Sequence, residues 1–73
     1  MNWNKLTDPT QDSPELPELD VHVMFYYKDG NKYLLGRLVE YRGMKIWESD
    51  HRMHFPLPTG KITHWTSFDR VPT

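Results

Sequence analysis

The feature that most constrains the fold is an alternation of side chains with period two, which recurs in four stretches of the chain. Successive side chains of a strand point to opposite faces, so this period is typical of β-structure. Short turns separate the first three stretches: residues 28–31 supply Asp-Gly and Gly-Asn, which tolerate the positive φ of a tight reversal, and Arg42-Gly43 makes a second short turn. We therefore predict a mostly antiparallel meander of about four strands, at residues 21–27, 32–41, 44–49 and 61–68.

The alternation does not always show which face of a strand is buried. Residues 21–27 are rather apolar on both faces, which favours a central position in the sheet or a second face covered by residues 1–20. Gly36 interrupts the second strand and indicates a bulge or a bend. In the third strand, Ile46 and Trp47 point to opposite faces. The pattern thus predicts the strands without predicting which side of them forms the core.

The length of the chain favours a single domain of marginal stability, because a chain of this size buries only about 60% of its unfolded surface. No cysteine is present to form a disulfide, so we expect the core to depend on three Trp, four Tyr and three Phe. The predicted fold class is all-β, with a β-rich α+β fold as the alternative. Open sheet edges and surplus aromatic side chains favour a homodimer, with a monomer as the alternative.

Residues 1–20 differ in composition from the rest of the chain. Three prolines interrupt acidic and small polar residues, which disfavours helix and leaves few apolar side chains to bury. We predict an extended, acidic, proline-rich arm that docks through Trp3 and is looser over residues 7–13. Residues 21–73 then form the sheet domain.

Several functional classes have no support in the sequence. The apolar runs are far shorter than the roughly 20 residues that span a bilayer, and no secretory signal pattern is present, so we expect a cytoplasmic protein without membrane association. Period two places His64 and Ser67 on opposite faces, which argues against a local catalytic triad. We predict a non-enzymatic protein without a cofactor. His51 and His54 have a metal-ligand spacing but no helix to orient them, so we predict loop histidines and no metal site.

Two segments are predicted to bind a protein partner. The arm has five carboxylates against one lysine and suits a basic groove of a partner; the alternative is a solvated terminus. The second segment is the loop before the last strand. The predicted arm residues are Asp8, Asp12, Glu15, Glu18 and Asp20, and the loop residues are His51, Arg52, His54 and Phe55.

A sheet face that binds single-stranded nucleic acid is the alternative function. Aromatic rings such as Tyr26 and Tyr33 would stack on bases, while Lys and Arg would neutralise phosphates. Residues 28–73 hold eight Lys and Arg against five acids, and this small surplus places nucleic acid second to a protein partner. The predicted face comprises Arg37, Arg42, Lys45, Trp47 and Lys61.

Short motifs lie at both ends of the chain: Trp3, Leu6, Asp8, Leu16-Pro17 and Thr63-His64-Trp65. With these motifs the sequence resembles a family of small proteins of unknown function carried by phages and prophages. It departs from the family pattern at residues 66–68, where Thr-Ser-Phe stands in place of Met-Pro-Leu. The resemblance implies a phage origin and a β-rich fold, and it brings no known activity.

In a phage setting, a small binding protein would inhibit or modulate a protein of the host. We therefore predict a phage-type accessory protein that acts in the host bacterial cytoplasm. Its expected partner is a host protein, such as a nucleic-acid-processing or defence enzyme.

Overall fold

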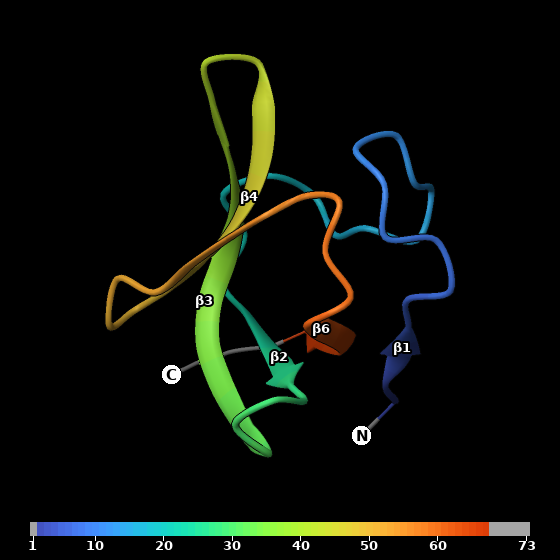
Figure 1. The fold of residues 1–73 in the computed structure, drawn as a ribbon, viewed down its shortest axis with the longest axis vertical. Helices are drawn as coiled ribbons and strands as arrows, with labels where there is room; N and C mark the ends of the chain where they lie inside the picture. Colours follow the sequence, from blue (N-terminus) through green and yellow to red (C-terminus); the bar gives the residue numbers. More distant parts are fainter. Residues whose placement is uncertain (1, 68–73) are drawn as a thin grey trace, which may run out of the picture.

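The computed structural model describes residues 2–67, and every regular element among them is a β-strand (Figure 1). The strands form one antiparallel sheet, which confirms the predicted all-β class, but there are six of them in place of about four. Their bounds are β1 (Asn4–Lys5), β2 (Val23–Tyr27), β3 (Lys32–Tyr41), β4 (Met44–Ser49), β5 (His54–Pro56) and β6 (Ile62–Ser67). Phe68, the predicted end of the last strand, lies outside the described residues.

The four predicted strands are present as β2, β3, β4 and β6, and the bounds of β3 and β4 are as predicted. Both predicted reversals form. The turn between β3 and β4 has Arg42 at a φ of 54° and Gly43 at 77°. Because both central residues have positive φ, the twist of this turn matches that of the flanking strands. Residues 50–59, predicted as a loop, contain the short strand β5.

The strands lie in the order β1-β6-β2-β3-β4-β5. The run from β2 to β5 is a meander, but β6 then returns to the far side of β2, where Trp65 lies opposite Phe25. The last strand within residues 2–67 is therefore an interior strand, and β2 is central as predicted. The two edges are the two shortest strands, which limits the unpaired backbone groups offered to another chain.

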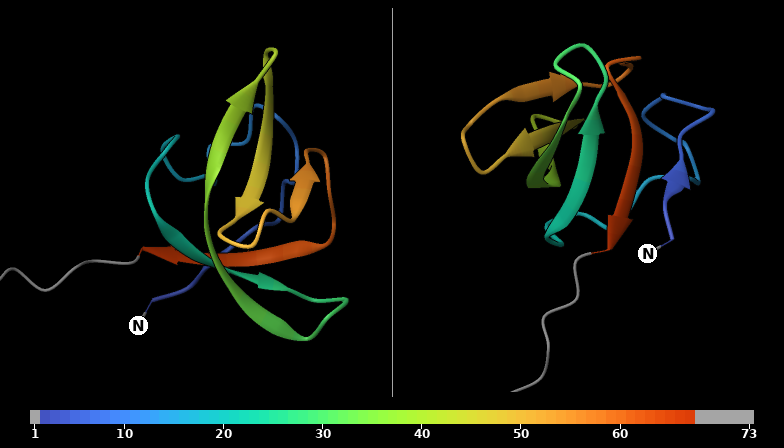
Figure 2. Two further views of the ribbon diagram at one scale, coloured as in Figure 1. Left: turned by 90° about the vertical axis from the view of Figure 1, so that its left-hand side faces the viewer. Right: turned by 90° about the horizontal axis from the view of Figure 1, so that it is seen from below.

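The long strand β3 curves, and it carries the sheet around the core (Figure 2). Its first half pairs with β2, its second half pairs with β4, and Gly36 belongs to both ladders without a shift in register. Of the predicted bulge or bend at Gly36, the bulge is absent and the strand curves instead, while the register shift of the sheet lies between Tyr26 and Tyr27 against β6. A Cβ at Gly36 would lie 2.1 Å from the backbone oxygen of Glu48, so the close approach of β4 requires glycine.

The inner side of the sheet holds an aromatic core. Trp47 is fully buried with its ring centroid 5.1 Å from that of Phe25, and Phe55 meets Phe25 edge-on at 6.5 Å. The inward position of Trp47 places Ile46, its neighbour in β4, on the outer face. The other buried hydrophobic residues are Val23, Leu34, Leu38, Leu57 and Ile62.

Residues 6–22 form a folded loop against the sheet, and the predicted extended arm is not confirmed (Figure 1). The Leu6 amide donates to the Thr63 carbonyl at 2.9 Å, which continues the pairing of β1 with β6. Further along the loop, the indole Nε1–H of Trp65 donates to the Glu15 carbonyl at 2.7 Å. The leucines of the loop pack against the core, namely Leu6, Leu16 and Leu19.

Gln11 joins this loop to the other half of the sheet. Its side-chain oxygen accepts from the Lys45 amide at 2.6 Å, and its side-chain nitrogen donates to the carbonyls of Lys45 and Leu57 at 3.1 and 2.9 Å. The Lys45 Nζ donates in turn to the Gln11 carbonyl at 2.9 Å. The amide side chain thus pairs with β4 as a backbone peptide would. Residues 7–13, predicted as the looser part of the arm, contain this contact.

We expect Gln11→Ala to lower the free energy of unfolding by about 2 kcal/mol, because part-buried backbone groups lose their partners. Urea unfolding followed by circular dichroism measures the loss. Asp12→Ala, at an exposed neighbour in the same turn, is the control and should change the free energy by less than about 0.5 kcal/mol. Equal effects of the two substitutions would show that Gln11 does not hold the loop.

Candidate functional site

Four ring side chains meet on the outer face of the sheet: Trp3, Tyr26, Tyr33 and His64, which we call the outer aromatic cluster. The ring centroids of Tyr26 and Tyr33 lie 5.3 Å apart, and those of Trp3 and Tyr33 lie 5.4 Å apart. The His64 ring meets Tyr26 edge-on at 6.5 Å. Rings at these separations attract each other beyond the effect of buried area. Four separate parts of the chain thus contribute to one continuous surface.

The register of the strands explains why these side chains meet. Tyr26 lies opposite Tyr33 on one side and opposite His64 on the other, and His64 lies opposite Lys5. Residues opposite each other in a ladder have their side chains on the same face. Phe25, beside Tyr26 in β2, and Leu34, beside Tyr33 in β3, are buried, so the alternation directs this row outward. Trp3 precedes β1 and places its ring against Tyr33.

A hollow of about 400 Å³ lies over the cluster and is lined by its four rings and Asn31. The Tyr26 hydroxyl donates to Asn31 Oδ1, and Thr63 Oγ1 lies 2.9 Å from His64 Nδ1. These contacts orient two of the rings. Tyr33 is 63% exposed and Trp3 36%, so part of each ring is accessible. Rings that are already held in place lose little side-chain entropy on binding.

Three exposed lysines lie near the cluster, although neither a lysine nor a carboxylate is among the residues that line its hollow. Lys5 is paired with His64, and the Lys28 amide donates to the Lys61 carbonyl at the end of the sheet where β2 turns into β3. Lys32 lies at the same end but opposite Tyr27, so alternation directs it to the other face from Tyr33. We call Lys5, Lys28 and Lys61 the rim of the cluster, and their positive charge favours an anionic or acidic partner surface.

Two of the five predicted arm carboxylates are used within the protein. The Glu15 carboxylate accepts from the amide and hydroxyl of Thr7 at 2.8 and 2.6 Å and from the Asp8 amide at 2.7 Å. The Asp8 carboxylate accepts from the hydroxyl of Thr10 at 2.7 Å. These bonds shape the loop, so Glu15 and Asp8 are engaged before any partner binds. The remaining three carboxylates are exposed: Asp12, Glu18 and Asp20.

The pKa of Glu15 lies below its ordinary value of 4.5, first because of the Thr7 hydroxyl and then because of the Asp8 amide. A carboxyl group with a lowered pKa in the folded state stabilises the fold above its unfolded pKa and loses that effect as the pH falls through the folded value. We expect Glu15→Gln to be less stable than the native chain at neutral pH, and the difference to shrink below pH 4.5. Thermal unfolding of both proteins at a series of pH values measures this, and a constant difference would contradict it.

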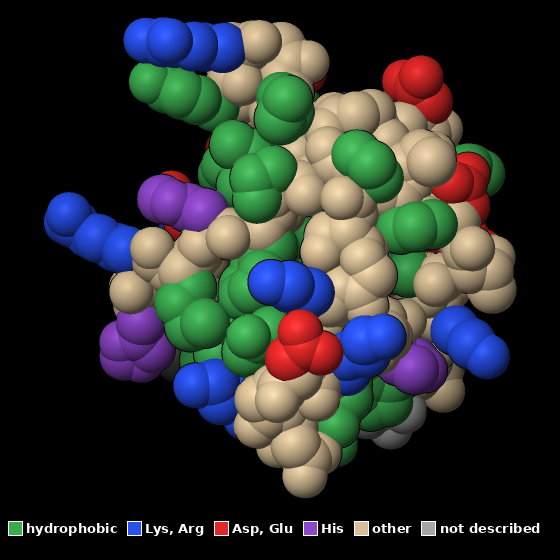
Figure 3. All heavy atoms as spheres, viewed as in Figure 1, with side chains coloured by type: hydrophobic (Ala, Val, Ile, Leu, Met, Phe, Trp, Pro, Cys, Tyr) green, Lys and Arg blue, Asp and Glu red, His purple; other side chains and the backbone are tan. Residues whose placement is uncertain are grey.

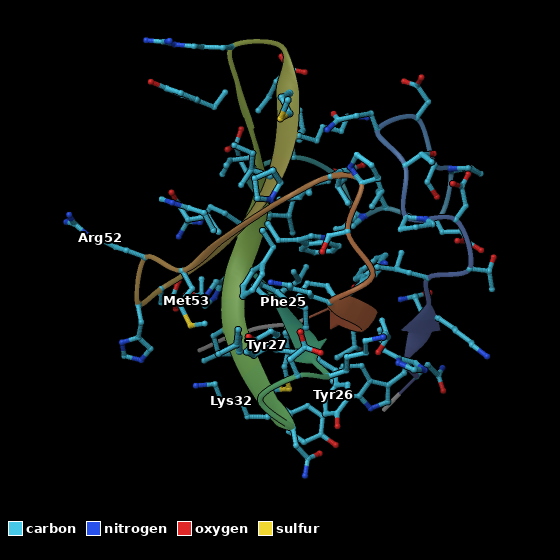
Figure 4. The ribbon with its side chains drawn as sticks, viewed as in Figure 1. Phe25, Tyr26, Tyr27, Lys32, Arg52 and Met53 are labelled. Atoms are coloured by element: carbon cyan, nitrogen blue, oxygen red, sulfur yellow. The ribbon has the colours of Figure 1, made fainter. Side chains whose placement is uncertain are left out.

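The predicted loop site is divided between the core and the surface. Phe55 is buried at 7% exposure, because the alternation of β5 points its ring inward, so the prediction that it binds a partner is wrong. His54 Nε2 lies 2.9 Å from the Glu48 carboxylate. His51 and Arg52 are exposed, and Figure 4 shows Arg52 directed away from the body of the protein.

The predicted nucleic-acid face is not assembled. Trp47 is fully buried, so the prediction that it contacts a ligand is wrong. Its side chain points inward from β4 and packs in the core. The Lys45 Nζ is bonded to the Gln11 carbonyl and lies against the N-terminal loop. Trp47 and Lys45 therefore do not lie on one face with the other predicted residues, Arg37, Arg42 and Lys61.

The three arginine and lysine residues left from that prediction lie apart. Arg37 lies opposite Glu48, and both line a polar hollow beside β4. Arg42 is at the tip of the β3–β4 hairpin, with its guanidinium carbon 5.2 Å from the ring centroid of Tyr41. Lys61 belongs to the rim of the outer aromatic cluster. The structure thus brings only Lys61 to the site described above.

The side chains of the outer aromatic cluster are suited to binding another molecule. Within residues 2–67, no group of three or more His, Cys, Asp or Glu side chains is placed to hold a metal ion. His64 is half-buried with Nδ1 directed to Thr63, while Ser67 is exposed on the same strand. No helix in this part of the chain is long and apolar enough to cross a membrane. The cluster itself supplies ring faces, one amide and a rim of ammonium groups.

Part of the cluster can be read from the sequence. Tyr26 and Tyr33 lie at mirrored positions around the turn at residues 28–31, so a tight hairpin places them opposite each other. His64 and Trp3 were predicted as parts of the architecture, because nothing in a strand pattern tells which distant strand will lie beside β2. Pairing of β6 with β2 and of β1 with β6 adds them to the row.

Comparison of this chain with protein-family models, with curated proteins and with solved structures found no match. The resemblance of its ends to a phage and prophage family therefore stays a prediction.

Proposed function

We propose that this protein is a non-enzymatic binding module that docks on a protein partner through the outer aromatic cluster. In the phage setting that the terminal motifs suggest, it is an accessory protein of the host bacterial cytoplasm. It binds a host protein and inhibits or modulates it by covering part of its surface.

The observation that supports this proposal is the exposure of the cluster in so small a protein. The core already contains Trp47, Phe25 and Phe55, yet Trp3 and Tyr33 remain 36% and 63% exposed on the opposite face. Trp and Tyr are the side chains that most often dominate the binding energy of protein interfaces. Rings that contact each other, outside the core and around a hollow, are suited to that role.

The surroundings of the cluster indicate the chemistry of the partner. Interface centres are apolar or aromatic, and charged groups lie at the rim, as they do here. The lysine rim favours a partner with carboxylates around an apolar centre. Binding by strand addition is disfavoured, because both edge strands are short and Pro56 in β5 lacks an N–H.

The test compares capture by the native chain with capture by two matched variants. Immobilised protein is incubated with nuclease-treated bacterial lysate, and bound proteins are identified and quantified. We expect Tyr33→Ser to lose a stoichiometric protein partner and Tyr41→Ser to retain it; the two tyrosines are 63% and 60% exposed. A partner retained equally by both variants, or no stoichiometric partner at all, would refute the proposal.

A second candidate, binding of single-stranded nucleic acid, is supported by the three lysines of the rim: Lys5, Lys28 and Lys61. Each would contact a phosphate while a base stacks on Tyr33. With at most three such contacts, the logarithm of the binding constant should fall with the logarithm of salt with a slope no steeper than about −2. Fluorescence anisotropy of a labelled oligonucleotide measures this slope, and absence of binding at low salt would exclude this function.

A further inference from the structure

The β3–β4 hairpin carries a second apolar surface (Figure 3), and none of the residues that line its hollow lines the hollow of the aromatic cluster. Alternation along β3 and β4 directs these side chains outward, and Tyr41 and Met44 are 60% and 45% exposed. A hollow of about 640 Å³ lies over the surface and is also lined by Glu40, Glu48 and His54. We call the hairpin face the set Val39, Tyr41, Met44, Ile46 and Pro56.

Arg42 occupies the tip of the hairpin in a backbone conformation that does not suit it. Its φ is 54°, and the following Gly43 has a φ of 77°. Turns with two positive φ values favour Asn-Gly, since an arginine side chain is strained in this region. The guanidinium group lies over the exposed ring of Tyr41 and is free to contact another molecule. A strained residue at an exposed tip points to a role outside the folding of the hairpin.

The charges on the hairpin are complementary to each other. Arg42 is a cation at the tip, and the Glu48 carboxylate lies at the hollow, 2.9 Å from His54 Nε2 and opposite Arg37 in the ladder, whereas alternation directs the Glu40 side chain to the other face with Lys45. In a two-fold contact of two hairpins lying antiparallel, the tip of each covers the hollow of the other. The apolar pair Val39 and Ile46, which lies opposite in the ladder, is then close to the two-fold axis. A self-complementary surface of this kind is what an isologous dimer requires.

We propose that the hairpin face is the interface of a homodimer, in which Arg42 of each copy contacts Glu48 of the other. Tyr41 and Met44 of one copy fill the apolar hollow beside Ile46 and Pro56 of the second. The contact is small, so the dimer is weak, with a dissociation constant on the order of 10 to 100 µM. This inference is independent of the proposed function, because the aromatic cluster remains uncovered in the dimer.

Analytical ultracentrifugation of the full chain at concentrations from about 5 to 500 µM tests the dimer. We expect the native protein to change from monomer to dimer over this range and Met44→Glu to remain monomeric. Met44 is exposed, so the variant should keep its circular dichroism spectrum and melting temperature. Tyr33→Glu, in the aromatic cluster, is the control and should dimerise as the native chain does. A native protein that is monomeric at the highest concentration would overturn the proposal.

Exchange of charges tests the geometry of the contact. Arg42→Glu and Glu48→Arg should each weaken dimerisation at least tenfold. An equimolar mixture of the two variants should form a heterodimer, because one contact is then reversed in sign and the other is native. Failure of the mixture to associate more tightly than either variant alone would refute this pairing.

Arg42→Asn distinguishes a loss of binding from a loss of folding. Asparagine suits the turn, so the melting temperature of the dilute monomer should rise while dimerisation weakens. A variant that dimerises as tightly as the native chain would show that Arg42 takes no part in the interface.

Discussion

Replacing Gly36 with alanine should destabilise the native state by about 3 kcal/mol, enough to unfold a large fraction of so small a protein. The added Cβ would lie 2.1 Å from the backbone oxygen of Glu48 and 2.7 Å from the Cα of Ser49. These are backbone atoms of β4, and they cannot withdraw unless the ladder between β3 and β4 opens. The substitution therefore weakens the pairing of β3 with β4, and no change of side-chain rotamer relieves the clash.

Gly60→Ala is the matched control, because a Cβ at Gly60 meets nothing within 4 Å. We expect that variant to differ from the native chain by less than about 1 kcal/mol in urea unfolding. If Gly36→Ala proved as stable as Gly60→Ala, the close approach of the β4 backbone to Gly36 would be wrong. A large loss confined to Gly36 would support the curvature of the sheet that Figure 2 shows.

Trp47→Ala should cost about 3 to 5 kcal/mol, because it removes the largest fully buried side chain of the core. The ring packs against Phe25 at 5.1 Å, and its loss leaves a cavity that the surrounding strands cannot fill. We expect this variant to lose the near-UV circular dichroism signal of fixed aromatic side chains and the cooperative melting transition of the native chain. Tyr41→Ala, with a ring that is 60% exposed, should keep the native spectrum and melting transition.

Trp47→Phe separates packing from hydrogen bonding at the same position. The indole Nε1 of Trp47 is buried and has no hydrogen-bond partner among the described residues. Phenylalanine removes this unsatisfied donor and keeps most of the ring, so the loss should be clearly smaller than for alanine. Similar losses for the two variants would show that the indole N–H does find a partner in solution. Because Trp47 is structural, its substitution is unsuitable as a test of ligand binding.

Most strands of this protein follow from local patterns. The bounds of β3 and β4, the hairpin turns and the central place of β2 all rest on alternation and on the short glycine-containing turns between the strands. Two short strands were missed, because β1 and β5 have only 2 and 3 residues. Alternation needs about four residues to be recognised. The proline-rich composition of residues 1–20 was interpreted as an extended arm, but Gln11 and Trp65 fold that segment onto the sheet.

The candidate site was predicted less well than the fold. Of the residues expected to bind, Trp47 and Phe55 are in the core, and Glu15 holds its own loop together. Trp, Phe and Glu occur both in binding surfaces and in structural roles, and composition alone does not distinguish a binding residue from a structural one. The tyrosines of the outer aromatic cluster, Tyr26 and Tyr33, were among the aromatic candidates, and their pairing follows from the hairpin.

Period two and glycine turns are properties of neighbouring residues, so they are encoded locally and place the strands and hairpins of this chain. The position of β6 between β1 and β2, the inward side of β4 and the meeting of Trp3 and His64 with the two tyrosines depend on contacts between residues far apart in the sequence. Such contacts form because one curved sheet must bury Phe25, Trp47 and Ile62 together. That requirement belongs to the whole chain, and no segment of the sequence expresses it.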